Sequence, residues 1–254
     1  MPLLLVFGHI VVNCFRSLYL LDDSMDYYNN NEMEKHPSMK RPVFGISRHR
    51  MGIDGKGITT LVAFMGCPLH CEYCLNSQCH APVFENDGKS LRKGILMLSP
   101  KELYDIVKKD NIYFQSTGGG ICFGGGEPAM ASDFIIEFAR LRPKNWKLTI
   151  ETSLRCPEEN IEVLSSYIDE WIVDVKDMNG VIYKNYTGME SCMAQQLKNL
   201  KKFVPLKNIT VKVPLIPNFN RKADVENSIC LLEEMGFENI IRINYIERKI
   251  NITR

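Results

Sequence analysis

Three closely spaced cysteines are the residues of this sequence best suited to metal chemistry. Cys67, Cys71 and Cys74 have the spacing C-x3-C-x2-C, which lets one short loop direct three thiolates towards a single centre. Thiolates are the usual ligands of iron–sulfur clusters, which ordinarily take four of them. No fourth cysteine follows at a close, regular spacing, so three ligands would leave one iron open. The motif therefore indicates a cluster that performs chemistry on a bound molecule.

Zinc is the main alternative at this motif. The three cysteines together with His70 or His80 could form a Cys3His site, although His70 lies between two of the cysteines, where reaching the same metal is sterically awkward. Cys79 is a further candidate ligand, but we interpret it as a free thiol of the same loop. The remaining cysteines are scattered and are expected to be small buried core residues: Cys14, Cys122, Cys156, Cys192 and Cys230.

A glycine-rich segment, GGGEP at residues 124–128, is the second candidate. Glycines allow positive φ and let a ligand approach the backbone closely. A phosphate-binding loop is one alternative, but the Lys-Ser/Thr pair of a P-loop is missing and Glu127 would repel phosphate. A tight strand-to-helix turn is the other. The preceding cysteine motif favours ligand binding.

Charged residues end three other predicted strands. They lie in the segments ETS (151–153), DVKD (174–177) and TVKVPLIPN (210–218). Alternation along a strand sends Asp174 and Lys176 to one side, while the flanking valines face the helices. Inward-pointing charges are costly unless they are paired or bind something. The alternatives are a surface pair at a frayed strand end, and a solvated lysine at Lys212.

Strand-like and helix-like segments alternate from residue 58 onward. The pattern predicts strands at 58–65, 119–123, 147–152, 170–176, 208–215 and 239–246, and helices at 99–110, 132–142, 157–166, 191–203 and 222–235. Six strands separated by helices imply parallel pairing with right-handed crossovers. The fold class is α/β, either a partial (β/α)6 TIM-type barrel or a doubly wound sheet. The unusual clusters all fall at carboxyl ends of strands, which favours the barrel and one shared pocket.

Length and composition limit the remaining possibilities. The 254 residues, 45% of them hydrophobic, suffice for one sizeable core. We expect residues 1–41 to be an N-terminal extension, either poorly ordered or lying before the true start, and residues 42–254 to form the domain. The apolar first 21 residues contain Arg16 and lack a basic leader, which argues against a membrane span.

Charge and cysteine content point to a location and exclude some partners. A net charge of +1 gives no field that would attract nucleic acid or an anionic membrane. Nine cysteines, an odd number, argue against a disulfide framework and for a reducing cytoplasm.

The cysteine motif, with the aromatic Tyr73 before its third cysteine and a following GGEP loop, resembles the radical S-adenosylmethionine (SAM) superfamily. That resemblance implies a [4Fe-4S] cluster whose open iron binds the SAM amino and carboxylate groups. One electron then splits the S–C5′ bond and yields methionine and a 5′-deoxyadenosyl radical that abstracts hydrogen. It also implies that the main chain at Tyr73 contacts adenine. Gly125, Gly126 and Glu127 would then hold the SAM ammonium, with Glu127 supplying or ordering acceptors.

Four segments resemble one branch of that superfamily, the activating enzymes of glycyl radical enzymes, such as pyruvate formate-lyase activase. They are GIDGKGITTLVAFMGCPLHCEYC (52–74), ETS, DVKDMN (174–179) and VPLIPNFN (213–220). The resemblance implies that Glu151, Thr152 and Asp174 lie near a monovalent cation beside SAM. It further implies that Lys176 lies beside the reactive carbon as the catalytic candidate, and that Lys212 contacts SAM.

The chain also departs from that branch. Glu151 replaces an aspartate, Lys212 an arginine and Asn218 a glycine, and Asn244 to Glu247 stand where a histidine is usual. A ferredoxin-like cysteine insert is missing, so one cluster is expected. The implied partners are a glycyl radical enzyme and a reductant such as flavodoxin or ferredoxin. The alternatives are a radical SAM enzyme acting on a small molecule or peptide, and an iron–sulfur or zinc protein without SAM chemistry.

Overall fold

The computed structural model of the chain describes residues 39–244. Most of the predicted extension, residues 1–38, lies outside the described residues, and so does Cys14. The last two residues of the strand predicted at 239–246 also lie outside them. The boundary that we predict between the extension and the domain stays a prediction.

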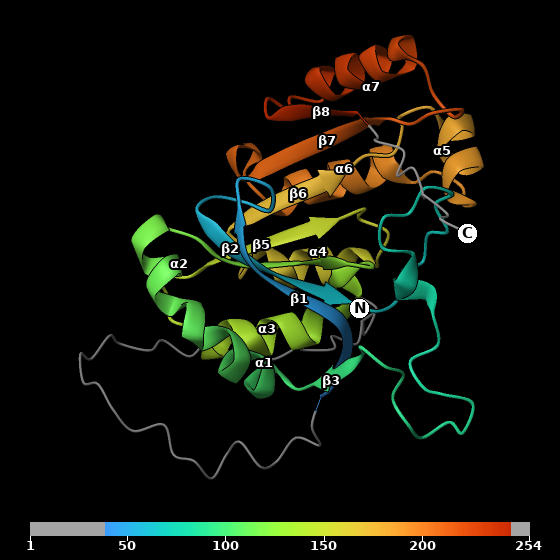
Figure 1. The fold of residues 1–254 in the computed structure, drawn as a ribbon. Helices are drawn as coiled ribbons and strands as arrows, with labels where there is room; N and C mark the ends of the chain where they lie inside the picture. Colours follow the sequence, from blue (N-terminus) through green and yellow to red (C-terminus); the bar gives the residue numbers. More distant parts are fainter. Residues whose placement is uncertain (1–38, 245–254) are drawn as a thin grey trace, which may run out of the picture. The chain divides into compact units, whose positions relative to one another are not determined.

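Eight strands within the described residues form one sheet, in the order β3-β1-β2-β4-β5-β6-β7-β8 (Figure 1). Their bounds are β1 Arg41–Met51, β2 Ile58–Phe64, β3 Leu96–Leu98, β4 Gly120–Gly125, β5 Lys147–Thr152, β6 Glu170–Asp174, β7 Ile209–Leu215 and β8 Ile240–Asn244. The strands from β2 through β4 to β8 pair in parallel, whereas β1 pairs antiparallel with β2 and with β3. We predicted the six parallel strands but neither antiparallel strand.

The strand order distinguishes the two architectures that the sequence left open. Each parallel strand is added beside the one before it, so the order never reverses, whereas a doubly wound sheet reverses at a switch point. The partial (β/α)6 barrel is therefore confirmed. Within the described residues β8 pairs only with β7, so this barrel is not closed.

The helices connect successive strands. Their bounds are α1 Pro100–Val107, α2 Asn111–Thr117, α3 Ser132–Leu141, α4 Glu158–Ser165, α5 Gly180–Thr187, α6 Met193–Phe203 and α7 Lys222–Glu234. The capping box predicted at Ser99 is present: Ser99 Oγ accepts from Glu102 N at 3.2 Å, and Ser99 N donates to Glu102 Oε2 at 2.7 Å. In the described part of the chain, no helix combines the length and apolarity needed to cross a membrane.

Two helices, α2 and α5, were not predicted, and the helix predicted to reach residue 110 ends at Val107. Both are short and rich in Asn, Thr, Tyr and β-branched residues, which have low helix propensity. Tertiary packing and capping compensate. Asn179 Oδ1 accepts from Val181 N at 2.9 Å at the start of α5, and Gly118 ends α2 in the left-handed conformation.

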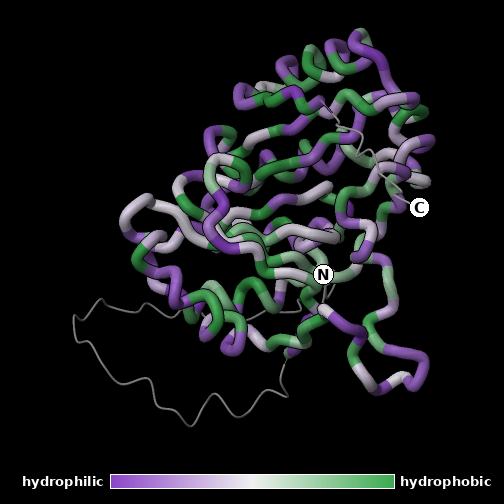
Figure 2. Tube along the Cα trace, viewed as in Figure 1, coloured by the Kyte–Doolittle hydropathy of each residue, from purple (hydrophilic) through white to green (hydrophobic). Residues whose placement is uncertain are grey.

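The hydrophobic core lies between the sheet and its helices. A row of paired positions crosses five strands on the helix-facing side, and each side chain in it is at most 1% exposed: Val62, Phe123, Ile150, Trp171 and Ile209. Hydrophobic residues accordingly recur along the strands in Figure 2. The second tryptophan, Trp146, is also buried, and its Nε1 donates to Asn111 Oδ1 at 2.7 Å.

A buried carboxylate ties β1 to the rest of the fold. Asp110 is fully buried, and its oxygens accept bonds from Arg48 Nε at 2.8 and 2.9 Å and from Thr60 Oγ1 at 3.0 Å. Burial by itself would raise the pKa of Asp110, but the bonds from Arg48 and Thr60 hold that pKa below its ordinary value. The antiparallel strand is thus joined to β2 and to the segment that precedes α2.

Candidate active site

The cysteine motif lies in the loop that follows β2, at the carboxyl edge of the sheet (Figure 1). This loop is irregular but anchored. Gly66 N donates to Cys79 O at 2.8 Å, and His70 N donates to Thr187 O at the end of α5 at 3.0 Å. Leu69, only 2% exposed, inserts into the core. The loop is therefore fixed by a bond within itself, by a bond to α5 and by packing against the core.

The three motif thiols differ in their surroundings, although all are half-buried. Burial raises the pKa of Cys67 to about 12 and that of Cys71 to about 11. The pKa of Cys74 falls to about 6 because its sulfur accepts a hydrogen bond from the thiol of Cys79. Metal ligands must be deprotonated, so a cluster would have to stabilise two thiolates that burial disfavours.

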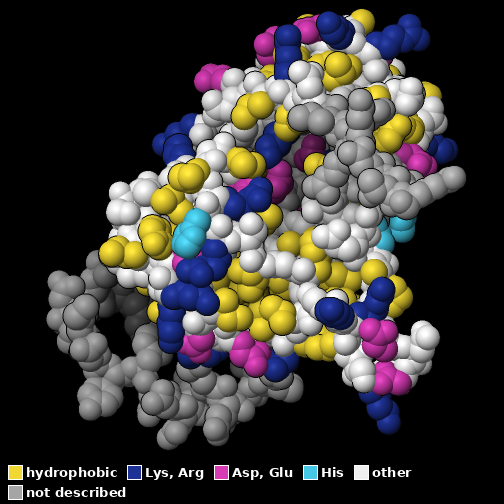
Figure 3. All heavy atoms as spheres, viewed as in Figure 1, with side chains coloured by type: hydrophobic (Ala, Val, Ile, Leu, Met, Phe, Trp, Pro, Cys, Tyr) yellow, Lys and Arg dark blue, Asp and Glu magenta, His cyan; other side chains and the backbone are white. Residues whose placement is uncertain are grey.

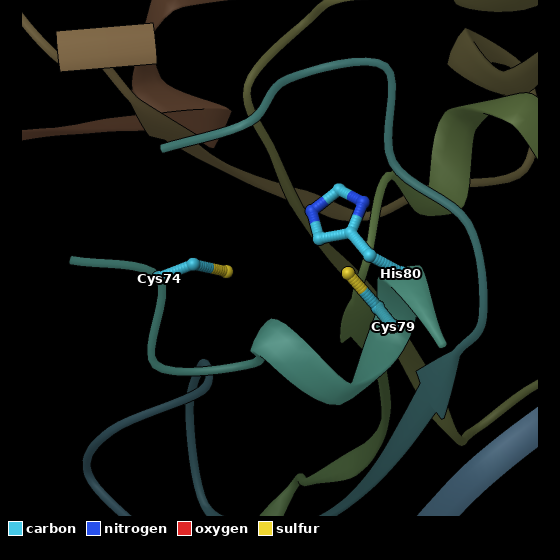
Figure 4. A group of neighbouring side chains, drawn as sticks. All are labelled: Cys74, Cys79 and His80. Carbon is cyan, nitrogen blue, oxygen red and sulfur yellow. The ribbon is translucent and has the colours of Figure 1, made fainter. Parts of the chain in front are cut away.

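The spacing of the sulfurs distinguishes a cluster from a single ion. Among the described residues, Cys74, Cys79 and His80 have ligand atoms that all lie within 4.8 Å of one another (Figure 4). The three motif cysteines do not meet this limit. A tetrahedral zinc ion with its usual bond lengths needs sulfurs about 3.8 Å apart. A cluster binds each thiolate at a separate iron and so accepts wider spacing. The motif triad fits the cluster better than one zinc ion.

The other cysteines only partly follow our expectation. Cys122 and Cys156 are buried core residues as predicted. The prediction is wrong for Cys230, which is exposed on α7, and for Cys192, which is half-buried before α6. Cys79 is only 2% exposed and lies against Cys74, and its interpretation as a thiol that binds no metal stays a prediction.

The glycine-rich segment is joined to the cysteine loop through the backbone. Gly126 N donates to Phe64 O at 2.9 Å, and Glu127 N donates to Gly66 O at 2.8 Å. A Cβ atom on Gly126 would lie 2.0 Å from the oxygen of Gly66. Gly125 has φ +93°, and a Cβ there would lie within 2.9 Å of Ala63. Close approach of the two segments thus requires both glycines, whatever ligand binds.

Glu127 is buried, and its carboxylate links the glycine-rich loop to the start of η3 (Pro128–Ala131) and to the end of β5. Its Oε1 accepts from Ala129 N at 3.1 Å and from Thr152 Oγ1 at 2.6 Å. Its Oε2 accepts from Ser153 N at 2.9 Å and from Ser153 Oγ at 2.6 Å. Both oxygens are already in use, which favours ordering of the loops over direct contact with a ligand.

Four charged side chains lie on the inner side of the sheet. Lys212 Nζ lies 2.5 Å from Glu151 Oε1, and Lys176 forms an ion pair with Asp174. The two lysine side chains are only 13% and 15% exposed, so neither is a solvated surface lysine. Burial alone would lower the pKa of each lysine, but its carboxylate partner raises that pKa above the ordinary value.

The alternation predicted for this segment is confirmed, because Val173 and Val175 are fully buried on the opposite side. The inner charges therefore belong to the mouth of the barrel. Acidic and basic side chains gather in the hollow at the centre of the face drawn in Figure 3.

The three residues implied for a cation have other partners. The Thr152 hydroxyl donates to Glu127 and accepts from Leu154 N at 2.8 Å. Glu151 and Asp174 are each paired with a lysine. The cation therefore stays a prediction.

Tyr73 has a partner that the sequence did not predict. Asn218 Nδ2 donates to Tyr73 Oη at 3.2 Å, which joins the cysteine loop to the segment after β7. Asn218 has φ +68°, a left-handed conformation that asparagine tolerates better than most residues. The one hint in the sequence was that Asn218 stands where the family that the chain resembles has a glycine. The sequence named Ser153 only as part of the ETS segment, without its bonds to Glu127, and named His80 only as a possible ligand in the zinc alternative.

The turn between β1 and β2, residues 52–57, contacts strands at the opposite end of the barrel. Gly55 has φ +111°, and a Cβ atom there would lie 2.6 Å from Thr149 Oγ1. Lys56 N donates to Glu170 Oε2 at 3.3 Å. Both partners lie in β5 and β6 well before the carboxyl ends. Residues 52–57 therefore lie at the end of the sheet away from the cysteines.

Comparison with known proteins agrees with this arrangement. Residues 61–229 match the family model described as the radical SAM superfamily. The (2S)-3-sulfopropanediol dehydratase activating enzyme of Klebsiella oxytoca is 28% identical over 249 residues, covering 76% of this chain and 78% of that protein. The pyruvate formate-lyase 2-activating enzyme of Escherichia coli (strain K12) is 30% identical over 206 residues, covering 70% and 67%.

A solved structure supports the fold. Native anSMEcpe with bound AdoMet superposes with a TM-score of 0.52 at 20% identity, covering 73% of this chain and 50% of that chain. At that level of identity the likeness concerns the fold alone.

Proposed function

The chain belongs to the radical SAM superfamily, and from this premise we propose that it activates a partner glycyl radical enzyme. Its cofactors are a [4Fe-4S] cluster and SAM. When bound and reduced by one electron, they supply methionine and a 5′-deoxyadenosyl radical. That radical takes a hydrogen atom from a glycine Cα of the partner, which leaves 5′-deoxyadenosine and a glycyl radical.

The single observation that carries this proposal is the convergence of the cysteine loop, the GGGEP loop and the inner charges at one open edge of the sheet. The backbone bonds from Gly126 and Glu127 to the cysteine loop hold two of these parts together. Asp174 and Lys212, which are paired in the register of β6 and β7, support the inclusion of the third. Several curated relatives are named as activating enzymes, which supports the choice of substrate.

Within this site we propose that Cys67, Cys71 and Cys74 hold the cluster. Their chemistry fits, because three thiolates leave one iron free for SAM. Tyr73, Gly125, Gly126 and Glu127 would line the SAM site: Tyr73 through its main chain, and Glu127 as the residue that orders the glycine loop.

The charged side chains would take up new partners when SAM binds. Lys212 can exchange Glu151 for the SAM carboxylate, which would release Glu151 to act with Thr152 and Asp174 on a cation. Lys176 is the proposed catalytic residue beside the hydrogen transfer. Its pairing with Asp174 keeps it charged and fixes its position.

The open barrel supports a protein substrate. Six parallel strands leave β8 without a second neighbour in the described part of the sheet, so the mouth is laterally accessible. A reactive radical needs its target docked and water excluded, whereas a small metabolite needs an enclosing pocket. A partner that carries its glycine on a loop would provide the closure. We further propose flavodoxin or ferredoxin as the electron donor and the cytoplasm as the location.

The decisive experiment combines anaerobically reconstituted protein, a reductant, SAM and a candidate glycyl radical enzyme. We expect about four irons per chain by cluster stoichiometry, formation of 5′-deoxyadenosine and a glycyl doublet in the EPR spectrum. Alanine at Cys67, Cys71 or Cys74 should abolish all three signals.

Cys230→Ala is the matched control, because it removes an exposed thiol far along the chain from the motif, and it should retain all three signals. Rapid SAM turnover with a small metabolite, and no doublet with any glycyl radical enzyme of the same organism, would argue for the small-molecule alternative instead.

A further inference from the structure

Cys79 and His80 can both bind metal, have no role in the proposed function, and lie against Cys74 of the cysteine motif. The ligand atoms of Cys74, Cys79 and His80 all lie within 4.8 Å of one another. Figure 4 shows the two sulfur atoms facing each other, with the His80 ring beside them. The short helix η1 (Ser77–His80) sets this arrangement, and Cys79 N donates to Asn76 O at 2.8 Å at its start.

The imidazole of His80 has a buried nitrogen with no hydrogen-bond partner among residues 39–244, namely Nε2. Buried polar atoms are nearly always satisfied, and an exception calls for an explanation such as a bound ion. The ring is also held in place, because it stacks on His70 with ring centroids 4.7 Å apart. A fixed imidazole with a free lone pair beside two thiols is a partial metal site.

We propose that Cys74, Cys79 and His80 form a second metal site, which takes one Zn²⁺ ion when the chain carries no cluster. Two thiolates and one imidazole are the donors that zinc prefers, and a water molecule would complete the tetrahedron. Both cysteines bind as thiolates, so the ion and the two thiolates together are neutral. A closure of about 1 Å brings ligands within 4.8 Å to the spacing of a tetrahedral zinc site.

The consequence is competition at Cys74. This cysteine belongs to the proposed zinc site and to the proposed cluster site, so one chain cannot hold both. Zinc would occupy Cys74 in the cluster-free chain and would have to dissociate before a cluster forms. The zinc site itself does not depend on the proposed function; only the competition does.

The test uses the full-length chain, freed of metal and titrated anaerobically with Co²⁺ and then with Zn²⁺. We expect one ion per chain and thiolate-to-cobalt absorption that zinc abolishes. Cys79→Ser and His80→Ala should each weaken zinc binding by at least about tenfold, since even the partners of metal ligands contribute that much. Cys67→Ser is the matched control, because it removes a motif cysteine outside the trio, and its zinc affinity should change less than about twofold.

Two further measurements keep the result interpretable. Circular dichroism of each variant shows whether it has folded, and Cys79→Ser and His80→Ala test the site independently of each other. Prior loading with zinc should slow iron uptake several-fold in the wild type, and this slowing should disappear in Cys79→Ser. Zinc binding that survives in both trio variants, or that Cys67→Ser weakens as strongly as Cys79→Ser, would overturn the proposal. A failure of iron uptake in the zinc-free wild type would instead contradict the proposed function.

Discussion

At the scale of single residues, the site combines side chains whose partners are already within the protein. Glu127 accepts four hydrogen bonds, Lys212 pairs with Glu151, and Lys176 pairs with Asp174. A half-buried charge without a partner is costly. Each pair therefore offsets the cost of burying its charges before any cofactor binds, and Lys212 has to change partners to contact SAM.

Glu127 offers a sharp test of this view. In Glu127→Gln, the amide NH2 must face donors that cannot all rotate away, because two of them are the backbone N–H groups of Ala129 and Ser153. We expect the free energy of unfolding to fall by about 1–3 kcal/mol, the cost of an unsatisfied buried group. Chemical denaturation of the cluster-free chain measures it.

The matched control is Glu137→Gln, which changes an exposed glutamate of α3 paired with Arg140; it should alter stability by less than about 0.5 kcal/mol. If Glu127→Gln were as stable as this control and only SAM binding were lost, Glu127 would contact SAM directly.

At the scale of elements, periodicity predicted all six parallel strands and five of the seven described helices to within a few residues, because buried faces leave a regular pattern. It missed α2 and α5, where capping and packing outweigh low helix propensity. It also missed β1, whose second half is largely exposed and carries little pattern.

For the candidate site, the cysteines, Glu127 and the inner lysines could be predicted because motif spacing and strand alternation are local signals. The ion pairs that join Lys212 to Glu151, and the contact between Tyr73 and Asn218, are not local. They join residues distant in sequence, and a single sequence read by itself does not indicate which distant residues meet.

The close backbone contact between the cysteine loop and the GGGEP segment can be tested by adding a single methyl group. Gly126→Ala places a Cβ atom 2.0 Å from Gly66 O, so one of the two segments must move. We expect a loss of about 1–3 kcal/mol in the free energy of unfolding, as for other overpacked sites, together with reduced iron uptake. Thermal unfolding and iron analysis measure the two effects.

Gly45→Ala is the control for that change, since a Cβ there meets nothing closer than 3.9 Å and the backbone is not left-handed. Equal behaviour of the two variants would mean that the segments are not rigidly joined.

At the scale of the whole molecule, the sheet is asymmetric. One end is extended by the antiparallel strands β1 and β3, while β8 stands at the other end. The buried carboxylate of Asp110 accepts bonds from Arg48 in β1 and from Thr60 in β2, and so links the two strands. The attachment of β1 therefore depends on a charge that titrates in acid.

This dependence gives a prediction about pH. The folded-state pKa of Asp110 is lowered, so its contribution to stability is present above its ordinary pKa near 4 and is lost as pH falls through the folded value. Asp110→Asn should lower the free energy of unfolding at pH 7 by about 1–3 kcal/mol, since it weakens the hydrogen bonds that a buried carboxylate accepts. The gap to wild type should narrow as the pH approaches 3, measured by urea denaturation.

Asp105→Asn serves as the comparison, because Asp105 pairs only with exposed lysines and should cost less than about 1 kcal/mol. A gap between Asp110→Asn and wild type that stayed constant down to pH 3 would show that the charge of Asp110 is not what matters.

The burial of both tryptophans has a spectroscopic consequence. Trp146 and Trp171 are the two indoles of the chain, and both lie in the core, at most 1% exposed. An indole among apolar side chains emits at shorter wavelength than one in water. The emission maximum therefore reports whether the core is assembled, not what happens at the mouth of the barrel. A variant that loses iron or SAM but keeps blue-shifted emission has lost a ligand, whereas a red-shifted one has lost its fold.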